Sequence, residues 1–319
     1  MVRRPKAPSR TTRADDSFAK NAEEVRAGAW RYLYRYASET FGRRASIGIV
    51  EALLAKASRD WTQVKTGESG DLVYRREDGR AYAKMAAPAR SADLAGERDR
   101  LLWLQGKGIA VPEVIDWREV EEGACLVISA IPGVPAVDLD GDTLLKAWPS
   151  MARQLKSLHE LPTDQCTFDR SLSLMFAKAA DVVSRHAVNR DFLRPEDWGK
   201  PAGELLDRVE RDLPVRIAQE TADKVLCHGD ACMPNFMVDP HSLQCIGLID
   251  LGRAGKADRC VDLALMIANA EESWAKPEQG QKALSILFET LEIAKPDRER
   301  LAFYLRLDPL TWADSRGGE

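Results

Sequence analysis

The chain has 319 residues, 45 % of them hydrophobic and 30 % charged, and its 46 basic against 50 acidic residues give a formal charge of −4. This length and composition can build the core of one large or two modest domains, and they exclude a small disulfide scaffold or a wholly disordered protein. The negative charge disfavours nucleic-acid binding, and without an apolar run of membrane-span length or a secretory leader we expect a cytoplasmic protein that binds no membrane.

Residues 1–60 form an extension with two parts. Residues 1–14 carry several basic side chains and no acidic one among Pro, Ser and Thr, which predicts a disordered tail, with a transit peptide as the alternative. Between Ala22 and about Ser58 apolar residues recur at near-helical spacing, which predicts a helical segment. We expect the two main lobes of the chain to begin after this extension.

From Trp61 to Ala130 the apolar pattern has a period of two, interrupted by one helical stretch. Such alternation predicts β-strands, and the Asp78-Gly79 pair predicts a tight turn between two of them. The expected elements are strands at 62–66, 72–76, 80–86, 114–120 and 124–130, with a helix from about 91 to 105. Together they predict a small α+β lobe at 61–131 with five antiparallel strands.

A stretch rich in proline and glycine follows at 132–135, and the pattern beyond it is mostly helical. Short apolar runs at 225–227, 236–238 and 246–249 are the exceptions. An interruption of this composition is typical of a hinge between two parts of a fold. We therefore predict a bilobal α+β protein whose second lobe, 132–319, is mainly helical.

The clearest chemical signal lies around Asp230. It stands five residues before Asn235, and Asp250 ends the next apolar run and precedes Leu-Gly. An aspartate in a turn is by itself more often a turn or cap residue, but this spacing is that of the kinase catalytic loop. Phosphoryl transfer needs a carboxylate that orients the hydroxyl and oxygen ligands for magnesium. Asp230 is the candidate base, and Asn235 and Asp250 are the candidate Mg²⁺ ligands.

A second candidate pair is Lys84 and Glu97. Lys84 lies on the third expected strand, and Glu97 falls on the helical stripe formed by Leu94, Leu101 and Leu104. Because a carboxylate on an apolar face needs a cation, we predict an ion pair with Lys84, whose ammonium then reaches nucleotide phosphates. The alternative is a surface glutamate paired with a nearby arginine.

The turn at Gly67–Asp71 lies between the first two expected strands. It matches neither a GxGxxG loop nor a P-loop, and its simplest interpretation is a hairpin turn. Its place before the Lys84 strand favours contact of phosphate oxygens with the backbone at Gly70 and with the Ser69 hydroxyl.

At these residues the sequence resembles the aminoglycoside phosphotransferases, small-molecule kinases with a protein-kinase-like fold, and in particular their streptomycin 3''-phosphotransferase subgroup. The resemblance runs from about Trp61 to Trp312, whereas residues 1–60 depart from the family pattern. The segments that carry it are 66–71, 94–100, 130–135, 227–239, 248–253, 262–272 and 297–312.

The resemblance implies ATP- and Mg²⁺-dependent phosphorylation of a sugar hydroxyl of streptomycin, which confers resistance. It implies that segment 126–133, including Ile128 and Ala130, binds adenine through backbone groups. It also implies that His228 braces the catalytic loop and that Asp262 accepts hydrogen bonds from it, with a helix N-terminal role as the alternative for Asp262. The remaining carried-over roles are those already suggested for Asp230, Asn235, Asp250, Lys84 and Glu97.

The implied substrate carries two guanidinium groups, so its pocket needs carboxylates. Glu271, Glu272 and Asp308 lie on C-terminal helices where the family builds this pocket, and Trp274 and Trp312 are able to cover a guanidinium face. We predict pocket roles for Glu271 and Asp308, with solvated helix charges and core aromatics as the alternatives. We expect no obligate protein partner.

Two other functions remain open. The same scaffold can phosphorylate a different small amine, such as another aminoglycoside, choline or homoserine, because a fold does not fix the substrate. The other is a non-catalytic nucleotide-binding module that regulates a partner, which the intact candidate residues at 84, 230, 235 and 250 disfavour.

Overall fold

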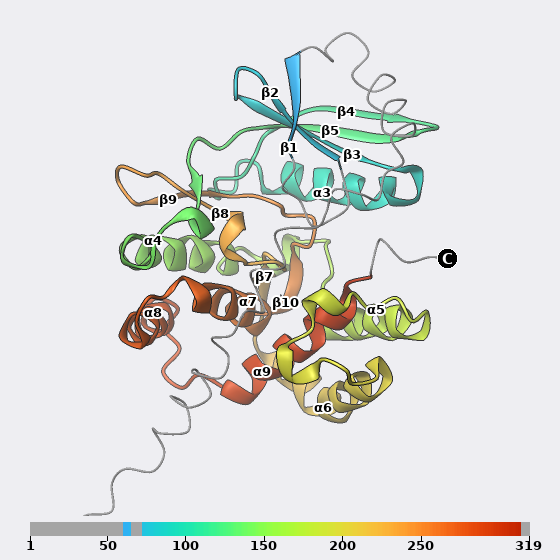
Figure 1. Ribbon diagram of the computed structural model, residues 1–319, viewed down its shortest axis with the longest axis vertical. Coiled ribbons are helices and arrows are strands. Elements are labelled where there is room, and N and C mark those ends of the chain that lie inside the picture. Colours follow the sequence, from blue (N-terminus) through green and yellow to red (C-terminus); the bar gives the residue numbers. More distant parts are fainter. Residues whose placement is uncertain (1–59, 65–71, 314–319) are drawn as a thin grey trace, which may run out of the picture.

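The computed structural model describes residues 60–64 and 72–313. Figure 1 shows two lobes, with a small sheet-containing lobe above a larger helical one. The bilobal α+β fold expected from the sequence is therefore confirmed. The predicted tail and helical segment at 1–59 and the predicted phosphate-binding residues Ser69 and Gly70 lie outside the described residues.

Five antiparallel strands form the sheet of the N-lobe in the order β1-β2-β3-β5-β4. Lys84 lies in β3, opposite Val73 of β2 and Leu126 of β5. Pairing on both sides fixes its backbone at the centre of the sheet. Each strand lies within about two residues of its expected range, because period-two alternation is a direct signal of a strand. The strands are β1 (Trp61–Val64), β2 (Leu72–Arg76), β3 (Ala81–Ala86), β4 (Val114–Val120) and β5 (Gly123–Ser129).

Helix α3 (Ser91–Leu104) packs against this sheet, on the side that faces the C-lobe (Figure 1). Its buried positions include Leu94, Glu97, Leu101 and Leu104, which recur every three or four residues. This spacing places them on one face of the helix. Glu97 therefore lies on the buried face, as the sequence predicted.

A three-stranded sheet, β6-β8-β9, follows the hinge. Strands β8 (Phe236–Val238) and β9 (Cys245–Leu248) match two of the predicted apolar runs, whereas β6 (Val134–Pro135) was not expected within a proline-rich stretch. It forms because it is an edge strand, where a proline removes no hydrogen bond from the interior of the sheet.

The C-lobe is mainly helical, as predicted. Helix α4 (Gly141–His159) is capped by Asp140, which accepts from the Thr143 N–H at 2.9 Å. Strand β7 (Lys224–Cys227) pairs antiparallel with β10 (Gly255–Asp258). The other helices are α5 (Leu172–Ser184), α6 (Ala202–Ala222), α7 (Cys260–Ala270), α8 (Pro277–Thr290) and α9 (Arg298–Leu307).

One hydrophobic cluster crosses the junction between the lobes. It contains Leu101 and Leu126 from the N-lobe together with Leu155, Phe236 and Leu287 from the C-lobe. The lobes are therefore packed on each other through buried apolar side chains. Within residues 60–64 and 72–313, no helix combines the length and apolarity that crossing a membrane requires.

Candidate active site

The loop between β7 and β8 carries Asp230 and Asn235. Gly229 adopts a φ of +81°, and a Cβ at this position would lie 2.2 Å from the carbonyl oxygen of Arg253, so glycine is required here. The loop ends in the 3₁₀ turn Met233–Asn235, where the side-chain amide of Asn235 donates to the carbonyl oxygen of Asp230 at 2.8 Å. The two candidate residues are thus fixed on one short loop.

Asp262, in the first turn of α7, anchors this loop from below. It is fully buried, and its carboxylate accepts from the backbone N–H groups of His228 and Gly229 at 2.7 and 2.8 Å. Nε2 of His159, on α4, lies 2.9 Å from the same carboxylate. Burial alone would raise the pKa of Asp262, but His159 and the donors of the loop hold it below its ordinary value. The predicted hydrogen bonds from the loop to Asp262 are confirmed.

Potential metal-ligand atoms of His159, Cys227 and Asp262 lie within 4.8 Å of one another. Both oxygens of Asp262 already accept backbone N–H donors, and the Cys227 thiol donates to the carbonyl oxygen of Asp258. The cluster is therefore a hydrogen-bonded anchor for the catalytic loop.

His228 braces the loop from the other side. Its Nδ1 accepts from the Asp230 N–H at 3.2 Å, and its Nε2 lies 3.0 Å from the carbonyl oxygen of Ile249. A neutral imidazole with its proton on Nε2 satisfies both contacts. His228 therefore connects Asp230 to the residue before Asp250, in agreement with the predicted bracing role.

Lys84 joins the N-lobe to the end of β9. Its ammonium donates to Glu97 at 2.6 Å and to Asp250 at 3.0 Å, and the exposed fractions of the three side chains are 17 %, 7 % and 50 %. Burial opposes the charge of Lys84, but the carboxylates of Asp250 and Glu97 outweigh it and raise its pKa. Lys84 in turn lowers the pKa of Asp250. The predicted ion pair between Lys84 and Glu97 is confirmed. The additional contact of Lys84 with Asp250 was not anticipated from the sequence.

Asp230 sits among charges of both signs. Burial raises its pKa, the positive charge of Arg253 opposes that rise, and the negative charges of Asp250 and Asp308 reinforce it. A carboxylate with a raised pKa is a better proton acceptor, as base catalysis requires. Sequence reasoning missed Arg253, although it stands three residues after Asp250 in the Leu-Gly-Arg sequence that follows it.

Arg170 is a second arginine at this site that the sequence did not reveal. Burial and the neighbouring Arg253 lower its pKa to about 10. Its Nη2 lies 3.6 Å from the Asp308 carboxylate, and a Cβ at Gly229 would lie 2.7 Å from its Nε. Arg170 therefore packs directly against the catalytic loop.

The two predicted substrate carboxylates have different surroundings. Glu271 is exposed and belongs to the 3₁₀ turn Glu271–Ser273. Desolvation by the surrounding chain and the nearby Glu196 and Glu272 raise its pKa, and the charge of Arg194 opposes that rise. Asp308 is buried and faces two arginines of the chain itself. Glu271 is therefore accessible to a cation, whereas Asp308 is already partly neutralised.

The two tryptophans predicted near the substrate also differ. Trp274 packs edge-to-face against the buried Trp148 at 5.3 Å between ring centroids, which matches the core-aromatic alternative. Trp312 is covered by a guanidinium, but that group belongs to Arg253, whose carbon lies 3.3 Å from the ring centroid.

The predicted adenine-binding segment runs along the lobe junction. Ile128 is a buried residue of β5, and the N–H of Ala130 donates to the carbonyl oxygen of Arg80 at 2.9 Å. Because that N–H is already bonded, it is not the group that a purine would contact.

The oxygens offered by Asn235 and Asp250 are of the type that Mg²⁺ prefers. Both residues stand at the same junction: the Ile249 N–H, one residue before Asp250, donates to the carbonyl oxygen of Asn235 at 3.0 Å. Half of the Asp250 side chain is exposed. The residues present therefore fit a divalent cation bound together with a nucleotide.

The sequence pattern of the phosphotransferase enzyme family matches residues 60–304. Among curated proteins, the streptomycin 3''-kinase of Streptomyces griseus is 47 % identical over 265 residues, which cover 83 % of this chain and 97 % of that protein. An aminoglycoside 3'-phosphotransferase of Streptomyces fradiae is 37 % identical, over 78 % of this chain and 94 % of that protein.

Among solved structures, the aminoglycoside phosphotransferase APH(3'')-Id from Streptomyces rimosus superimposes with a TM-score of 0.80 and 43 % identity, over 86 % of this chain and 100 % of that one. The same protein in complex with ADP and streptomycin gives a TM-score of 0.78 and 42 % identity, over 85 % of this chain and 98 % of that one.

Proposed function

The chain belongs to the phosphotransferase enzyme family, and from that premise we propose that it transfers the γ-phosphate of ATP to the 3''-hydroxyl of streptomycin. The observation that carries the proposal is its 47 % identity to a streptomycin 3''-kinase over 97 % of that protein. The related fold seen with ADP and streptomycin supports both substrates. Transfer of phosphate to the antibiotic would make this a resistance enzyme.

Asp230 is the proposed catalytic base. The streptomycin hydroxyl oxygen forms the new bond to the γ-phosphorus as the bond from that phosphorus to ADP breaks, and the hydroxyl proton passes to the Asp230 carboxylate. Three contacts of its loop support this role: those of Asp262, His228 and Asn235. A base held in place in this way loses little entropy when the reaction begins.

Lys84 is the proposed contact to the nucleotide phosphates. Glu97 holds its ammonium at the lobe junction, and the second partner, Asp250, places it beside a proposed Mg²⁺ ligand. Asn235 and Asp250 would hold Mg²⁺, which when bound neutralises charge on the phosphates. Backbone groups of segment 126–133 are the proposed adenine contacts, and Ser69 and Gly70 the proposed phosphate contacts.

Glu271 and Asp308 are the proposed partners of the streptomycin guanidinium groups. Glu271 is supported by its exposure and by the neighbouring acidic side chains of Glu196 and Glu272, which add negative charge to this surface. Asp308 would contribute from the inner side, where it shares its charge with Arg170 and Arg253. ATP is kept inside the cell, so we place the reaction in the cytoplasm.

A comparison of acceptors tests the proposal. Release of ADP would be measured with ATP and Mg²⁺ in the presence of streptomycin, kanamycin, hygromycin or choline. Streptomycin is expected to give the highest kcat/KM. A higher value for another acceptor would reassign the substrate. If no acceptor stimulated the release of ADP, a non-catalytic nucleotide-binding module would be favoured.

A further inference from the structure

Trp312 makes contacts of three different kinds. Its ring lies 5.2 Å, between centroids, from that of Phe192, and its Nε1–H donates to Oδ2 of Asp308 at 3.0 Å. The guanidinium of Arg253 covers the ring. The backbone adds a fourth contact, because the carbonyl oxygen of Trp312 accepts from the Asn189 N–H at 3.0 Å. Trp312 is therefore fixed by its neighbours and not by its own segment alone.

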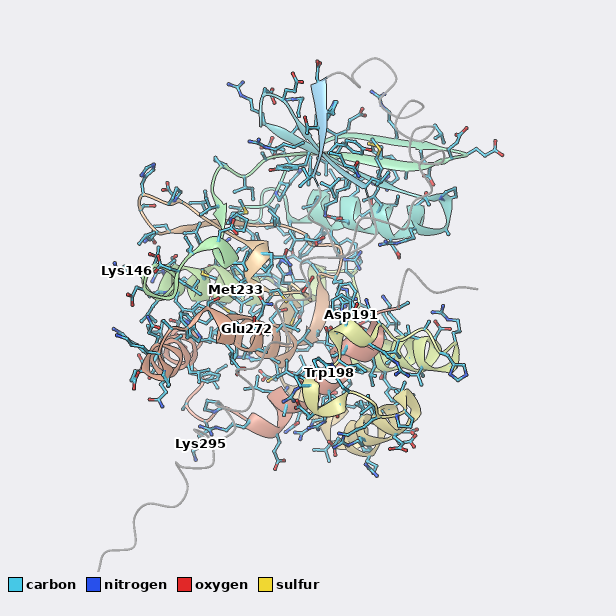
Figure 2. The ribbon with its side chains drawn as sticks, viewed as in Figure 1. Lys146, Asp191, Trp198, Met233, Glu272 and Lys295 are labelled. Carbon is cyan, nitrogen blue, oxygen red and sulfur yellow. The ribbon has the colours of Figure 1, made fainter. Side chains whose placement is uncertain are left out.

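Two of these contacts fasten the connection between α5 and α6, which spans 185–201. Phe192 and Asn189 both belong to it, and so do Asp191 and Trp198, labelled in Figure 2. The same connection contains Arg194 and Glu196, whose charges act on the proposed substrate carboxylate Glu271. Trp312 thus links a segment beside the proposed substrate pocket to Arg253.

Arg253 carries the chemistry of this link. Its carbonyl oxygen packs against Gly229, the residue before Asp230, and its positive charge acts on the Asp230 carboxylate. Within the described part of the chain, its side chain donates one hydrogen bond, to Oδ1 of Asp308, which is 3.4 Å long. A charge-assisted bond is normally about 2.7–2.9 Å, so Asp308 holds the guanidinium loosely. Stacking on Trp312 therefore supplies much of its orientation.

We propose that Trp312 is a positioning residue: it holds the Arg253 guanidinium beside the catalytic loop and couples it to the connection between α5 and α6. The inference rests on the proposed function. Without the ring, a long side chain with one weak hydrogen bond is free to move, and a displacement of about 1 Å near reacting groups costs up to about 10²-fold in rate. Because Trp312 acts through Arg253, its loss lowers kcat and leaves the KM for ATP unchanged. The KM for streptomycin changes less than kcat does, since Trp312 also donates to the proposed streptomycin partner Asp308.

The test compares kinetic parameters of three variants. Trp312→Leu is expected to lower kcat at least about tenfold, with the KM for ATP within about twofold of the unmodified chain and a smaller change in the KM for streptomycin than in kcat. Trp312→Phe keeps a ring for Arg253 and Phe192 and is expected to recover most of the activity. Trp198→Leu is the matched control: its indole donates to Leu193 within the same connection, and kcat is expected to remain unchanged.

A double variant identifies Arg253 as the group through which Trp312 acts. If the two residues act as one unit, the kcat of the double variant Trp312→Leu with Arg253→Gln equals that of the less active single variant. Additive losses would contradict the proposal, as would a rise in the KM for streptomycin at unchanged kcat, because direct contact with substrate would produce the latter. Should Trp312→Leu fail to fold, Trp312→Met, whose flexible side chain adapts to the space and has no π face, replaces it with the same expected results.

The proposed function and this inference fail separately. If the unmodified chain transfers no phosphate to streptomycin, the proposed function is wrong. If it does, and Trp312→Leu is as active as Trp198→Leu, only the role of Trp312 is wrong.

Discussion

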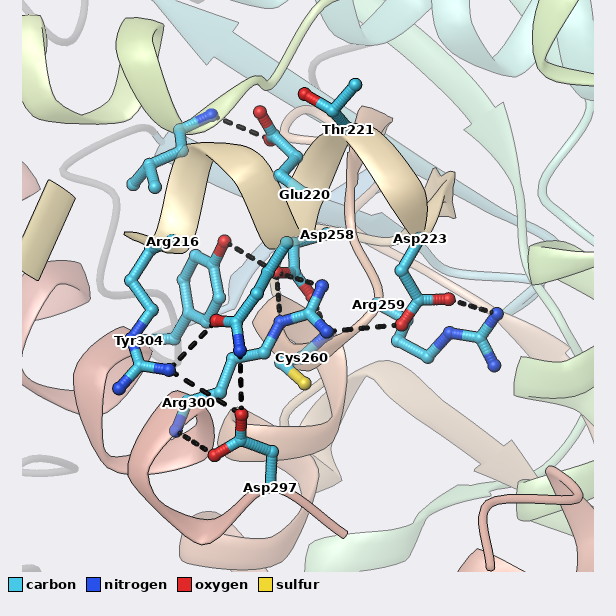
Figure 3. Close-up of polar contacts among 12 residues, drawn as sticks. Arg216, Glu220, Thr221, Asp223, Asp258, Arg259, Cys260, Asp297, Arg300 and Tyr304 are labelled. Carbon is cyan, nitrogen blue, oxygen red and sulfur yellow. Dashed lines mark hydrogen bonds and ion pairs between the residues drawn. The ribbon is translucent and has the colours of Figure 1, made fainter. Parts of the chain in front are cut away.

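Two clusters of charged side chains in this molecule use the same chemistry for different ends. At the lobe junction, Lys84 lies between the carboxylates of Glu97 and Asp250. Deep in the C-lobe, Arg300 lies between Asp258 and Asp223 (Figure 3). In each cluster one cation joins two carboxylates from elements far apart in the sequence.

The clusters differ in how far their carboxylates are enclosed. Asp258 is fully buried and also accepts from the Tyr304 hydroxyl at 3.0 Å, and Asp223 also binds Arg259 at 2.6 Å. Asp250, in contrast, keeps half of its side chain exposed. We call the Arg300 cluster closed, because Asp258 is enclosed with its partners, and the Lys84 cluster open, because the exposed part of Asp250 can still accept from a ligand.

The closed cluster supports the site indirectly. It joins the end of α6 to β10 and α9, and β10 pairs with β7, the strand that leads into the catalytic loop. We therefore expect changes in the open cluster to alter binding and catalysis, and changes in the closed cluster to alter stability.

The largest expected effect is on catalysis at the proposed active site, beside the open cluster. Asp230→Asn should lower kcat by about 10²–10⁴-fold, because the hydroxyl loses its proton acceptor. ATP affinity should stay within about twofold, because the proposed nucleotide contacts lie elsewhere. Single-turnover kinetics and calorimetric ATP titration measure the two quantities. Unchanged turnover would remove Asp230 from the proposed mechanism.

Substitutions in the closed cluster should lower the free energy of unfolding. Arg300→Met leaves the buried carboxylate of Asp258 without its cation, and breaking a buried pair in this way costs about 3–5 kcal/mol of unfolding free energy. Tyr304→Phe, which removes one hydrogen bond to the same carboxylate, is the milder control at about 1 kcal/mol. Urea denaturation measures both. A change in the KM for ATP in the folded Arg300→Met protein would contradict the separation of the two clusters.

Asp250→Asn probes the exposed carboxylate of the open cluster. We expect the affinity for ATP in the presence of Mg²⁺ to fall by about 10–100-fold, a loss typical of changes to groups around a bound metal. Affinity without Mg²⁺ should change much less, and calorimetric titrations with and without the ion compare the two. Equal losses in both would assign the metal to other ligands.

The smallest expected effect concerns the ion pair inside the open cluster. Lys84→Met removes the cation 2.6 Å from the Glu97 carboxylate on the buried face of α3, and adding Glu97→Gln should restore part of the lost unfolding free energy. Pairs in direct contact couple by about 0.5–3 kcal/mol. Thermal or urea unfolding of the two single variants and the double variant gives this coupling, and additive losses would mean that the contact contributes nothing.

The open cluster was largely predictable from the sequence and the closed one was not. The stripe that carries Glu97 is periodic within one helix, and the spacing from Asp230 to Asn235 lies within one loop, so both signals are local. Asp223, Asp258 and Arg300 meet only through the packing of α6, β10 and α9, which no local pattern encodes. Strand β10 was missed for a related reason, because Gly255–Asp258 has no apolar alternation.

The same limit applies to the charges around Asp230. Arg170, Arg253 and Asp308 come from three distant segments, and their convergence makes the surroundings of Asp308 differ from those expected of an open substrate contact. The local sequence does not distinguish a helical carboxylate that faces a solvated pocket from one that faces an arginine of its own chain.

The position of the transferred phosphate is the most direct test of the proposed phosphorylation of the streptomycin 3''-hydroxyl. The purified chain would be incubated with streptomycin, ATP and Mg²⁺, and the product examined by mass spectrometry and by proton–phosphorus correlation NMR. We expect a single phosphate whose phosphorus couples to the proton at carbon 3'' of the N-methyl-glucosamine ring. Coupling to a proton at any other position, or no phosphorylated product, would contradict it.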